Sequence, residues 1–265
     1  MKPCSENRSI ADDIRSKIEN KSLQNIELHY YSVTDSTNTR AKERAKEKCD
    51  TAPAVFISAE QTAGRGRMGR RFESPRDGGL YISFLFYPHS SMTDAGFITA
   101  SAAVRAARVI EELCAVDVRI KWVNDLYVGE KKLAGILTEG EASGDGVHFA
   151  YAICGIGINL KGGALSAEIA EIATSIEECG GKLPDLTELA ARLTEEFFAP
   201  IDRSAVMEEY RSRSSIIGKD ITVHLILDEP YAARAVDITD EGALVILRDG
   251  SLTELQSAEV SIRKI

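Results

Sequence analysis

GRGRMGRR occupies residues 64–71 of this sequence and concentrates three glycines and four arginines in eight positions. Glycine lets a backbone approach a ligand closely, and successive amides can then form an anion-binding nest. Arginine adds planar forks that match the oxygens of phosphate or carboxylate groups. The stretch therefore predicts a loop that binds a polyanion such as a nucleoside triphosphate. A solvated basic loop or an RGG-like RNA contact is the alternative, because short glycine motifs are weak signals.

The composition restricts the classes of protein to consider. The chain has 265 residues, of which 44% are hydrophobic and 28% charged, as is ordinary for a globular protein with one sizeable core and a small second domain. Its 41 acidic residues outnumber 32 basic ones, which argues against a general nucleic-acid binder. The longest apolar run, residues 80–87, is too short to span a bilayer, and the N-terminus has no apolar segment typical of a signal peptide. We therefore expect a cytoplasmic protein without a membrane anchor.

The cysteines and histidines show no spacing that is typical of a metal site. The cysteines are Cys4, Cys49, Cys114, Cys154 and Cys179. They are odd in number, scattered and without a C-x-x-C pair, and the four histidines stand apart from one another. We expect reduced thiols and no metal held by protein side chains.

Helical and strand periodicities alternate on both sides of the basic loop. Before the loop, the pattern predicts a helix over residues 9–22, a strand over 29–33, a charged helix from about 36 to 48 and a strand over 54–58. After the loop, it predicts strands over 80–87, 118–128, 133–138 and 147–159, and helices over 94–113, 166–179, 186–198 and 203–211.

The end of the chain has a different pattern of short strands. They are predicted over residues 220–227, 232–238, 244–247, 252–255 and 260–263. Five short strands in roughly fifty residues indicate a small barrel of SH3 type. We place its boundary at residue 215. This divides the chain into an N-terminal helical extension (1–28), a main domain (29–215) and a C-terminal barrel (216–265).

Five motifs follow one another along the main domain. They are STN at 36–38, Gln61 with GRGRMGR at 64–70, KWVNDL at 121–126, KLAGIL at 132–137 and GIGIN at 155–159. In this order and spacing the motifs resemble those of the biotin protein ligases, and the similarity extends from about residue 30 to residue 265. Three positions depart from the family pattern. Val123 stands where many members have proline, Met68 where arginine or lysine is common, and Phe72 where tryptophan is frequent.

The resemblance implies an α+β fold. A mixed sheet packed with helices, as in the class II synthetase-like catalytic domain of biotin and lipoate ligases, would be followed by an SH3-like barrel. It also implies two half-reactions. ATP activates biotin to biotinyl-5′-AMP with release of pyrophosphate, and the biotinyl group then passes to a lysine with release of AMP. The implied substrates are ATP and biotin with Mg²⁺, and the implied acceptor is a biotin carboxyl carrier protein of acetyl-CoA carboxylase or a related biotin-dependent carboxylase.

The resemblance further implies roles for individual residues. Lys121 is the leading catalytic candidate, because a point charge there can touch both the biotin carboxylate and the α-phosphate as negative charge develops. Arg67 would cover the same two groups, and Asp125 would accept the proton of the incoming lysine. The implied biotin-binding residues are Ser36, Thr37, Asn38, Gln61, Gly64, Arg65, Gly66, Arg67, Lys121, Gly155 and Gly157. The implied ATP-binding residues are Arg65, Arg67, Arg70, Lys121, Asn124 and Asn159.

Several of these residues also have a purely structural interpretation. Ser36 and Thr37 are suitable caps for the helix that follows them. Gly155 and Gly157 clear one face of a strand, which would allow packing against a helix as well as approach of a ligand. Asp125 can be the structural partner of Asn124 or Lys132.

Two other functions stay open. A lipoate ligase or octanoyltransferase would share the scaffold, although the biotin-type order around Gln61 and Lys121 argues against it. A biotin-sensing DNA-binding repressor would need about three helices for a helix-turn-helix unit, and residues 1–28 are too few for one. We therefore expect no DNA contact, while a homodimer stays open.

Overall fold

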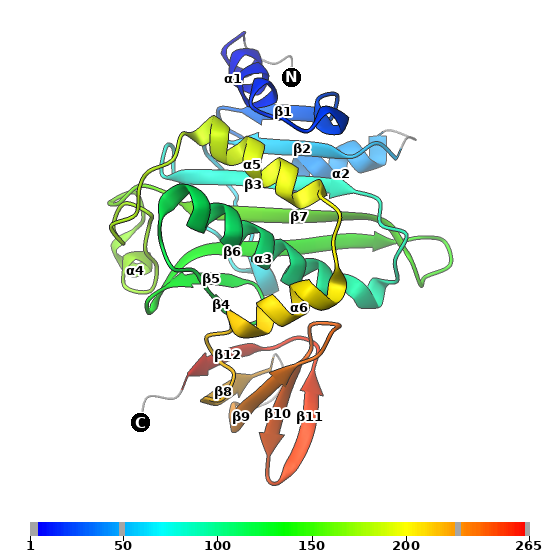
Figure 1. The fold of residues 1–265 in the computed structure, drawn as a ribbon, viewed down its shortest axis with the longest axis vertical. Coiled ribbons are helices and arrows are strands. Elements are labelled where there is room, and N and C mark those ends of the chain that lie inside the picture. The colour runs from blue at the N-terminus through cyan, green and yellow to red at the C-terminus, as the bar shows by residue number, and fades with distance from the viewer. Residues whose placement is uncertain (1–4, 48–50, 226–228, 263–265) are drawn as a thin grey trace.

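The computed structural model describes residues 5–47, 51–225 and 229–262. Within these residues the strands form a seven-stranded sheet and a five-stranded sheet, and helices pack against the larger one. Figure 1 shows the smaller sheet beyond one edge of the larger sheet, at the C-terminal end of the chain. The predicted α+β class is therefore confirmed. The division of the chain at residue 215 stays a prediction.

The larger sheet is mixed, as predicted. Its strands, in spatial order, are β1 (Glu27–Tyr31), β2 (Ala54–Ser58), β3 (Gly79–Phe86), β7 (Phe149–Asn159), β6 (Lys131–Ala142), β5 (Asp125–Val128) and β4 (Arg119–Lys121). Only β1 and β2 run parallel to each other, and each other neighbouring pair in this sheet is antiparallel. The strands β2 and β3 are buried over nearly their whole length, because helices cover both faces of the sheet at this point.

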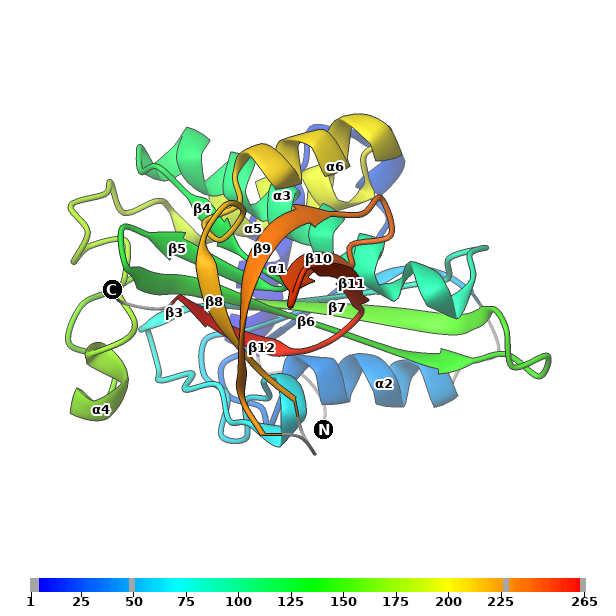
Figure 2. The same cartoon turned by 90° about the horizontal axis from the view of Figure 1, so that it is seen from below.

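Helices lie on both faces of this sheet. Figure 2 shows α3 (Ala95–Cys114) and α6 (Arg203–Ser212) on one face and α2 (Thr37–Glu47) on the other. α5 (Leu186–Phe198) packs beside α3. Asp185 caps the start of α5, because its carboxylate accepts hydrogen bonds from two backbone amides in the first turn of the helix. Most of α3 is buried, and its many alanines permit the close approach of α3 to the sheet.

The smaller sheet is antiparallel throughout. Its strands, in spatial order, are β11 (Ser251–Leu255), β10 (Leu244–Arg248), β9 (Tyr231–Ile238), β8 (Asp220–His224) and β12 (Glu259–Ile262). Residues 227 and 263, the ends of two predicted strands, lie outside the described residues, as do Cys4 and Cys49. Cys114, Cys154 and Cys179 are free thiols. In the described part of the chain, no helix is long and apolar enough to cross a membrane.

The prediction of one strand over residues 118–128 is wrong. The segment is a tight hairpin in which β4 and β5 pair, with Lys121 opposite Asp125. Trp122 and Val123 are both buried, whereas a straight strand would point them to opposite faces. The turn allows both to enter the core, where the Trp122 indole donates a hydrogen bond to the carbonyl of Gly242 over 2.9 Å.

The prediction of a helix over residues 166–179 is also wrong beyond its first turn, α4 (Ala167–Ala170). After that turn the backbone pairs with neighbouring segments instead of with itself. The amide of Lys132 donates to the carbonyl of Ile172, and the amide of Thr174 donates to the carbonyl of Lys132. The amide of Ile176 donates to the carbonyl of Asn159. Partners outside the segment therefore replace the helical hydrogen bonds that its apolar periodicity predicted.

The N-terminal helix begins and ends earlier than the predicted residues 9–22. α1 (Ser5–Ser16) ends six residues before residue 22, because the carboxylate of Glu195 accepts hydrogen bonds from the amides of Glu19 and Asn20. Two members of the predicted isoleucine stripe, Ile14 and Ile18, are nevertheless completely or almost completely buried in the main core.

Replacing Ile14 with alanine is expected to lower the free energy of unfolding by about 2–5 kcal/mol, because the change leaves a cavity in a closely packed core. Urea denaturation monitored by circular dichroism measures this change. Leu252→Ala is the matched control, since the Leu252 side chain is 66% exposed and its loss should cost about 0.5 kcal/mol or less. Equal effects of the two variants would mean that α1 does not pack as described.

Candidate functional site

A cavity of about 260 Å³ lies where the basic loop, the ends of several strands and the smaller sheet meet. Among the residues that line it are fourteen of the fifteen predicted site residues: Ser36, Thr37, Asn38, Gln61, Arg65, Gly66, Arg67, Arg70, Lys121, Asn124, Asp125, Gly155, Gly157 and Asn159. Residues from four separate segments, 36–38, 61–70, 121–125 and 155–159, are thus brought together. Gly64 is the exception, since it does not line the cavity. A Cβ atom at this position would lie 2.4 Å from the carbonyl oxygen of Phe72. Close packing against Phe72, and not contact with the cavity, therefore explains why this residue is a glycine.

One end of the cavity is built on the first turn of α2. The side-chain oxygen of Gln61 accepts a hydrogen bond from the Thr37 amide over 2.8 Å and another from the Thr37 hydroxyl over 3.1 Å. The Gln61 amide nitrogen donates to Ser74 Oγ over 2.8 Å. Gln61, which precedes the basic loop, therefore caps α2 in place of the expected serine or threonine side chain.

Two residues that the sequence analysis missed extend this polar network. Ser83 Oγ donates to Asn38 Oδ1 over 2.6 Å, and Asn38 Nδ2 donates to Glu139 Oε2 over 2.8 Å. The second oxygen of Glu139 forms an ion pair of 2.8 Å with Arg65. Ser83 had a signal in the sequence, as a hydroxyl within the apolar run of residues 80–87. The sequence contains no such signal for Glu139, because a glutamate at this position is typical of a solvated strand residue.

Side chains occupy the space next to Gly155 and Gly157, the two glycines near the end of β7. A Cβ atom at Gly155 would lie 2.2 Å from Asn38 Oδ1, and one at Gly157 would lie 2.5 Å from the ring of Phe72. These distances are far below a van der Waals contact, so both positions require glycine. The structure therefore supports the interpretation that Gly155 makes room for a helix residue, since Asn38 belongs to α2.

Lys121 ends β4 and points its ammonium group toward Tyr127. Its Nζ lies 3.5 Å from the Tyr127 hydroxyl and 5.4 Å from the centre of the Tyr127 ring. Burial lowers the pKa of Lys121, while the charges of Asp125 and Glu259 act in the opposite direction. No carboxylate of the described residues forms an ion pair with this lysine. Lys121 is therefore a half-buried cation that is available to an anionic ligand.

Asp125 and Asn124 are engaged in structural contacts. Asp125 Oδ1 lies 2.6 Å from Nζ of Lys132, one of the two structural partners that the sequence suggested for it and also a cavity residue. Asn124 Nδ2 donates to the carbonyl of Ile136 over 2.7 Å. Asp125 therefore has Lys132 as a structural partner, and it also lines the cavity.

The arginines of the basic loop reach the smaller sheet. Arg67 donates to Ser257 Oγ over 2.7 Å and to Asn124 Oδ1 over 3.3 Å. Arg70 forms a two-pronged ion pair with the carboxylate of Glu259. Ser257 and Glu259 were missed because they lie almost 190 residues further along the chain. These contacts hold the loop against one end of β12.

The opposite wall of the cavity carries Asn159 and the segment after β7. Asn159 Nδ2 donates to the carbonyl of Thr174 over 3.0 Å, which fixes the orientation of its amide. Trp122 is both a core residue and part of the cavity wall. Among the described residues, no three side chains of histidine, cysteine, aspartate or glutamate gather in a way that could hold a metal ion.

Comparisons with known proteins agree with this architecture. Residues 30–159 match the Biotin/lipoate A/B protein ligase family, and residues 216–263 match the Biotin protein ligase C terminal domain. A bifunctional ligase/repressor from Escherichia coli is 31% identical over 237 residues, which cover 87% of this chain and 72% of that protein. A biotin–[acetyl-CoA-carboxylase] ligase from Paracoccus denitrificans is 30% identical over 243 residues, which cover 86% of this chain and 97% of that protein.

A solved structure shows the same fold. The biotin protein ligase from Aquifex aeolicus, in complex with biotin and ATP, superposes with a TM-score of 0.70 and 28% sequence identity. The alignment covers 90% of this chain and 99% of that one, so both sheets are included.

Proposed function

Because this chain belongs to the biotin protein ligase family, we propose that its cavity activates biotin with ATP and then passes the biotinyl group to a lysine of a biotin carboxyl carrier protein. The carrier would be a subunit of acetyl-CoA carboxylase or of a related biotin-dependent carboxylase. The observation that carries the proposal is the position of Lys121, which has no carboxylate partner among the described residues. It shares one cavity with the loop arginines and with the Gln61 network.

In the first half-reaction, a carboxylate oxygen of biotin attacks the α-phosphorus of ATP. A bond forms between this oxygen and the α-phosphorus, which gives the mixed anhydride biotinyl-AMP. The bond between the α-phosphorus and the oxygen that bridges to the β-phosphorus breaks, and pyrophosphate leaves. Both reactants are anions, so the step needs cations placed where negative charge accumulates. Lys121 supplies a charge that β4 and the turn after it hold in place, and Arg67 covers the reacting groups from the loop.

In the second half-reaction, the lysine amine of the carrier attacks the acyl carbon of biotinyl-AMP. An amide bond forms, the acyl–phosphate bond breaks, AMP leaves, and the amine loses a proton. We assign Asp125 to accept that proton, with Lys132 holding its carboxylate in position. Asp125 lines the cavity, and it follows Lys121 by one tight turn.

The remaining assignments follow from the chemistry of each group. The hydrogen-bonding network around Thr37, Gln61 and Asn38 suits the ureido ring of biotin, because a buried urea needs donors and acceptors. Arg65, Arg70, Asn124 and Asn159 are assigned to the nucleotide. The residues present do not fit a metal site held by the protein. The carboxylates of Asp125 and Glu259 are already paired with cations, so Mg²⁺ is proposed to arrive as the chelate of ATP.

Mixing the purified protein with biotin, ATP, Mg²⁺ and a carrier domain tests the proposal. Mass spectrometry should show one biotinyl group on the carrier, and omission of ATP should abolish the transfer. Lipoate and octanoate in place of biotin form the comparison, since a lipoate ligase or octanoyltransferase would use the same scaffold. Transfer of lipoate or octanoate to the carrier, without any transfer of biotin, would overturn the proposal.

Replacing Gly155 with alanine is expected to raise the KM for biotin about tenfold, because the displaced Asn38 amide loses its hydrogen bonds to Ser83 and Glu139. Steady-state pyrophosphate release at varied biotin concentration gives this constant. Gly144→Ala is the control, since no atom lies within 4 Å of a Cβ atom at that position. An unchanged KM in the Gly155 variant would remove Asn38 from the biotin pocket.

A further inference from the structure

Glu139 on β6 is a carboxylate that holds two residues of the cavity wall. Its Oε2 accepts a hydrogen bond from Nδ2 of Asn38 over 2.8 Å, and its Oε1 forms an ion pair of 2.8 Å with Arg65. Asn38 and Arg65 line the cavity, whereas Glu139 is not among the described residues that do. Any effect of Glu139 on a ligand therefore passes through the residues that it holds.

The Asn38 side chain lies against β7 in the space that Gly155 leaves open. It is 4% exposed, and a Cβ atom at Gly155 would lie 2.2 Å from Asn38 Oδ1. That oxygen accepts a hydrogen bond from the Ser83 hydroxyl over 2.6 Å. The amide nitrogen faces β6, where Glu139 accepts at 2.8 Å and the carbonyl of Leu137 lies at 3.4 Å. Each end of the Asn38 amide thus has its own partner.

The partners of Asn38 differ in what they demand of its amide. Reversing an asparagine amide exchanges its oxygen and nitrogen with almost no change of shape, so only hydrogen bonds distinguish the two orientations. Ser83 tolerates both, because a hydroxyl can donate or accept. The Leu137 carbonyl only accepts, but at 3.4 Å its hydrogen bond is weak. The Glu139 carboxylate also only accepts, and at 2.8 Å it excludes the reversed orientation, in which two acceptors would meet.

The ion pair with Arg65 holds this carboxylate from its other side. Arg65 belongs to the basic loop and its side chain is 46% exposed, so the pair by itself adds little to stability. Its effect is geometric, because it fixes Oε1 and leaves Oε2 directed at Asn38. The same carboxylate therefore joins the loop to the first turn of α2 beside the cavity.

We propose that Glu139 is a positioning residue that holds the Asn38 amide in one orientation and thereby sets the pattern of donors and acceptors that the cavity presents to the ureido ring of biotin. The inference rests on the proposed function, since it takes biotin as the ligand. A ureido group carries two N–H donors and one carbonyl acceptor on a rigid ring. A reversed amide in the wall would place a donor where an acceptor is needed, and an unsatisfied buried group is costly.

Isothermal titration calorimetry with biotin and without ATP tests the inference, because it separates binding from the reaction. Glu139→Gln keeps the shape of the side chain but can donate or accept, so both orientations of the Asn38 amide become possible. The affinity for biotin should fall by about fivefold, as a neutral hydrogen bond replaces a charge-assisted one. Glu139→Lys can only donate and favours the reversed orientation, so the affinity should fall by about tenfold or more.

Glu141 provides matched controls. It lies two residues further along β6 and so on the same face of the sheet, and it accepts a hydrogen bond from the Tyr151 hydroxyl over 2.7 Å. Glu141→Gln and Glu141→Lys repeat the two charge changes and should leave the affinity within about twofold. Steady-state pyrophosphate release should show the same contrast in the KM for biotin. The kcat of Glu139→Gln should stay within about twofold, because its ion pair and hydrogen bond do not involve Lys121.

A double-mutant cycle separates action through Asn38 from action through Arg65. With Asn38→Ala there is no amide left to orient, so adding Glu139→Gln should change the affinity for biotin by less than about twofold. An undiminished effect of Glu139→Gln in this background would overturn the inference, and so would equal affinities of the Glu139→Gln and Glu141→Gln variants. Absence of biotin binding by the unmodified protein would instead refute the proposed function on which the inference rests.

Discussion

Replacing Lys121 with alanine is expected to slow the formation of biotinyl-AMP by about 10²–10³-fold, the scale on which one preorganised charge-stabilising group acts. Lys121 lacks an ion pair with any described carboxylate, so its charge is free to act on the two anions that must meet. The fold should be preserved, because the removed group is a partly desolvated charge and makes only a 3.5 Å contact with Tyr127. Biotin-dependent release of pyrophosphate measures the rate, and thermal unfolding measures the stability.

Lys131→Ala is the matched control for this experiment. Lys131 is exposed, lies on β6 and donates to the carbonyl of Ala170, outside the cavity. Its loss should leave the rate within about twofold of the unmodified protein, as for a surface substitution. Normal pyrophosphate release by the Lys121 variant would refute the assignment of this residue. A similar loss in both variants would show that the effect reports total charge and not position.

Replacing Arg67 with glycine is expected to leave adenylate formation largely in place but to let the intermediate escape. Arg67 links the loop to Asn124 near Lys121 and to Ser257 near β12, so its removal detaches the middle of the loop from both sides. An acyl-adenylate that leaves the cavity reacts with any exposed lysine. Biotin incorporation into albumin should therefore increase by about tenfold or more at equal adenylate production, since each lost charge-assisted hydrogen bond is worth about 1.5–3 kcal/mol.

Arg71→Gly separates this effect from a general loosening of the loop. Arg71 is exposed, and its side chain donates to the carbonyl of Thr62, at 3.1 Å. Its replacement should leave albumin unlabelled. If the Arg67 variant also failed to label albumin, Arg67 would not retain the intermediate, and its part would have to be sought in ATP binding.

Most of the larger elements could be predicted because their pattern is local. The alanine-rich helix α3, the apolar strands β2 and β3, and the short strands of the smaller sheet each follow from the periodicity of their own residues. The site motifs were equally readable, since Gln61, the loop arginines and Lys121 are of the residue types that anion chemistry requires. Two elements were predicted wrongly in type, the hairpin β4–β5 and the segment after α4, and both depend on distant residues. Gly242 accepts the hydrogen bond of the Trp122 indole, and Lys132 and Asn159 take backbone hydrogen bonds of the segment after α4.

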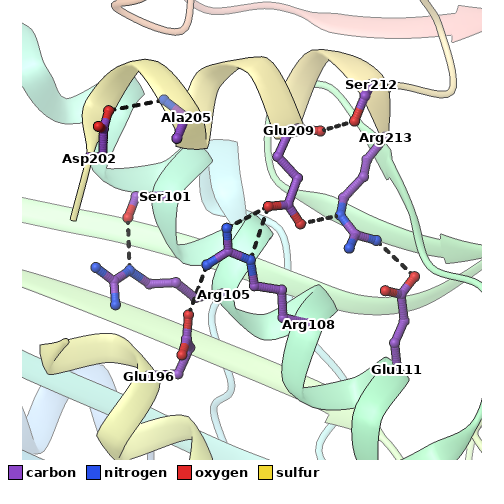
Figure 3. A network of polar contacts seen from close by, with 10 residues as sticks. All are labelled: Ser101, Arg105, Arg108, Glu111, Glu196, Asp202, Ala205, Glu209, Ser212 and Arg213. Carbon is purple, nitrogen blue, oxygen red and sulfur yellow. Dashed lines mark hydrogen bonds and ion pairs between the residues drawn. The ribbon is translucent and has the colours of Figure 1, made fainter. Parts of the chain in front are cut away.

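The partners of the site residues could not be predicted in the same way. Glu259 meets Arg70, and Ser257 meets Arg67, only because the smaller sheet packs against the basic loop. Nothing in the residues next to Glu259 distinguishes it from a solvated acid on an edge strand. The same is true of Arg105 on α3, which forms no ion pair among the described residues, because Glu196 and Glu209 are paired with Arg108 instead (Figure 3).

Sequence alone predicted most of the helices and strands and the identity of the charged groups, because periodicity and residue chemistry act over a few neighbouring positions. The fold class followed from the family resemblance that the five motifs carry. Tertiary structure decided which of those groups are free. Asp125 and Arg70 are carboxylate and guanidinium groups that look as available as Lys121, yet packing gives each of them a partner. The availability of a charge depends on distances between atoms that are far apart in the chain, and these distances exist only once the two sheets and their helices have come together.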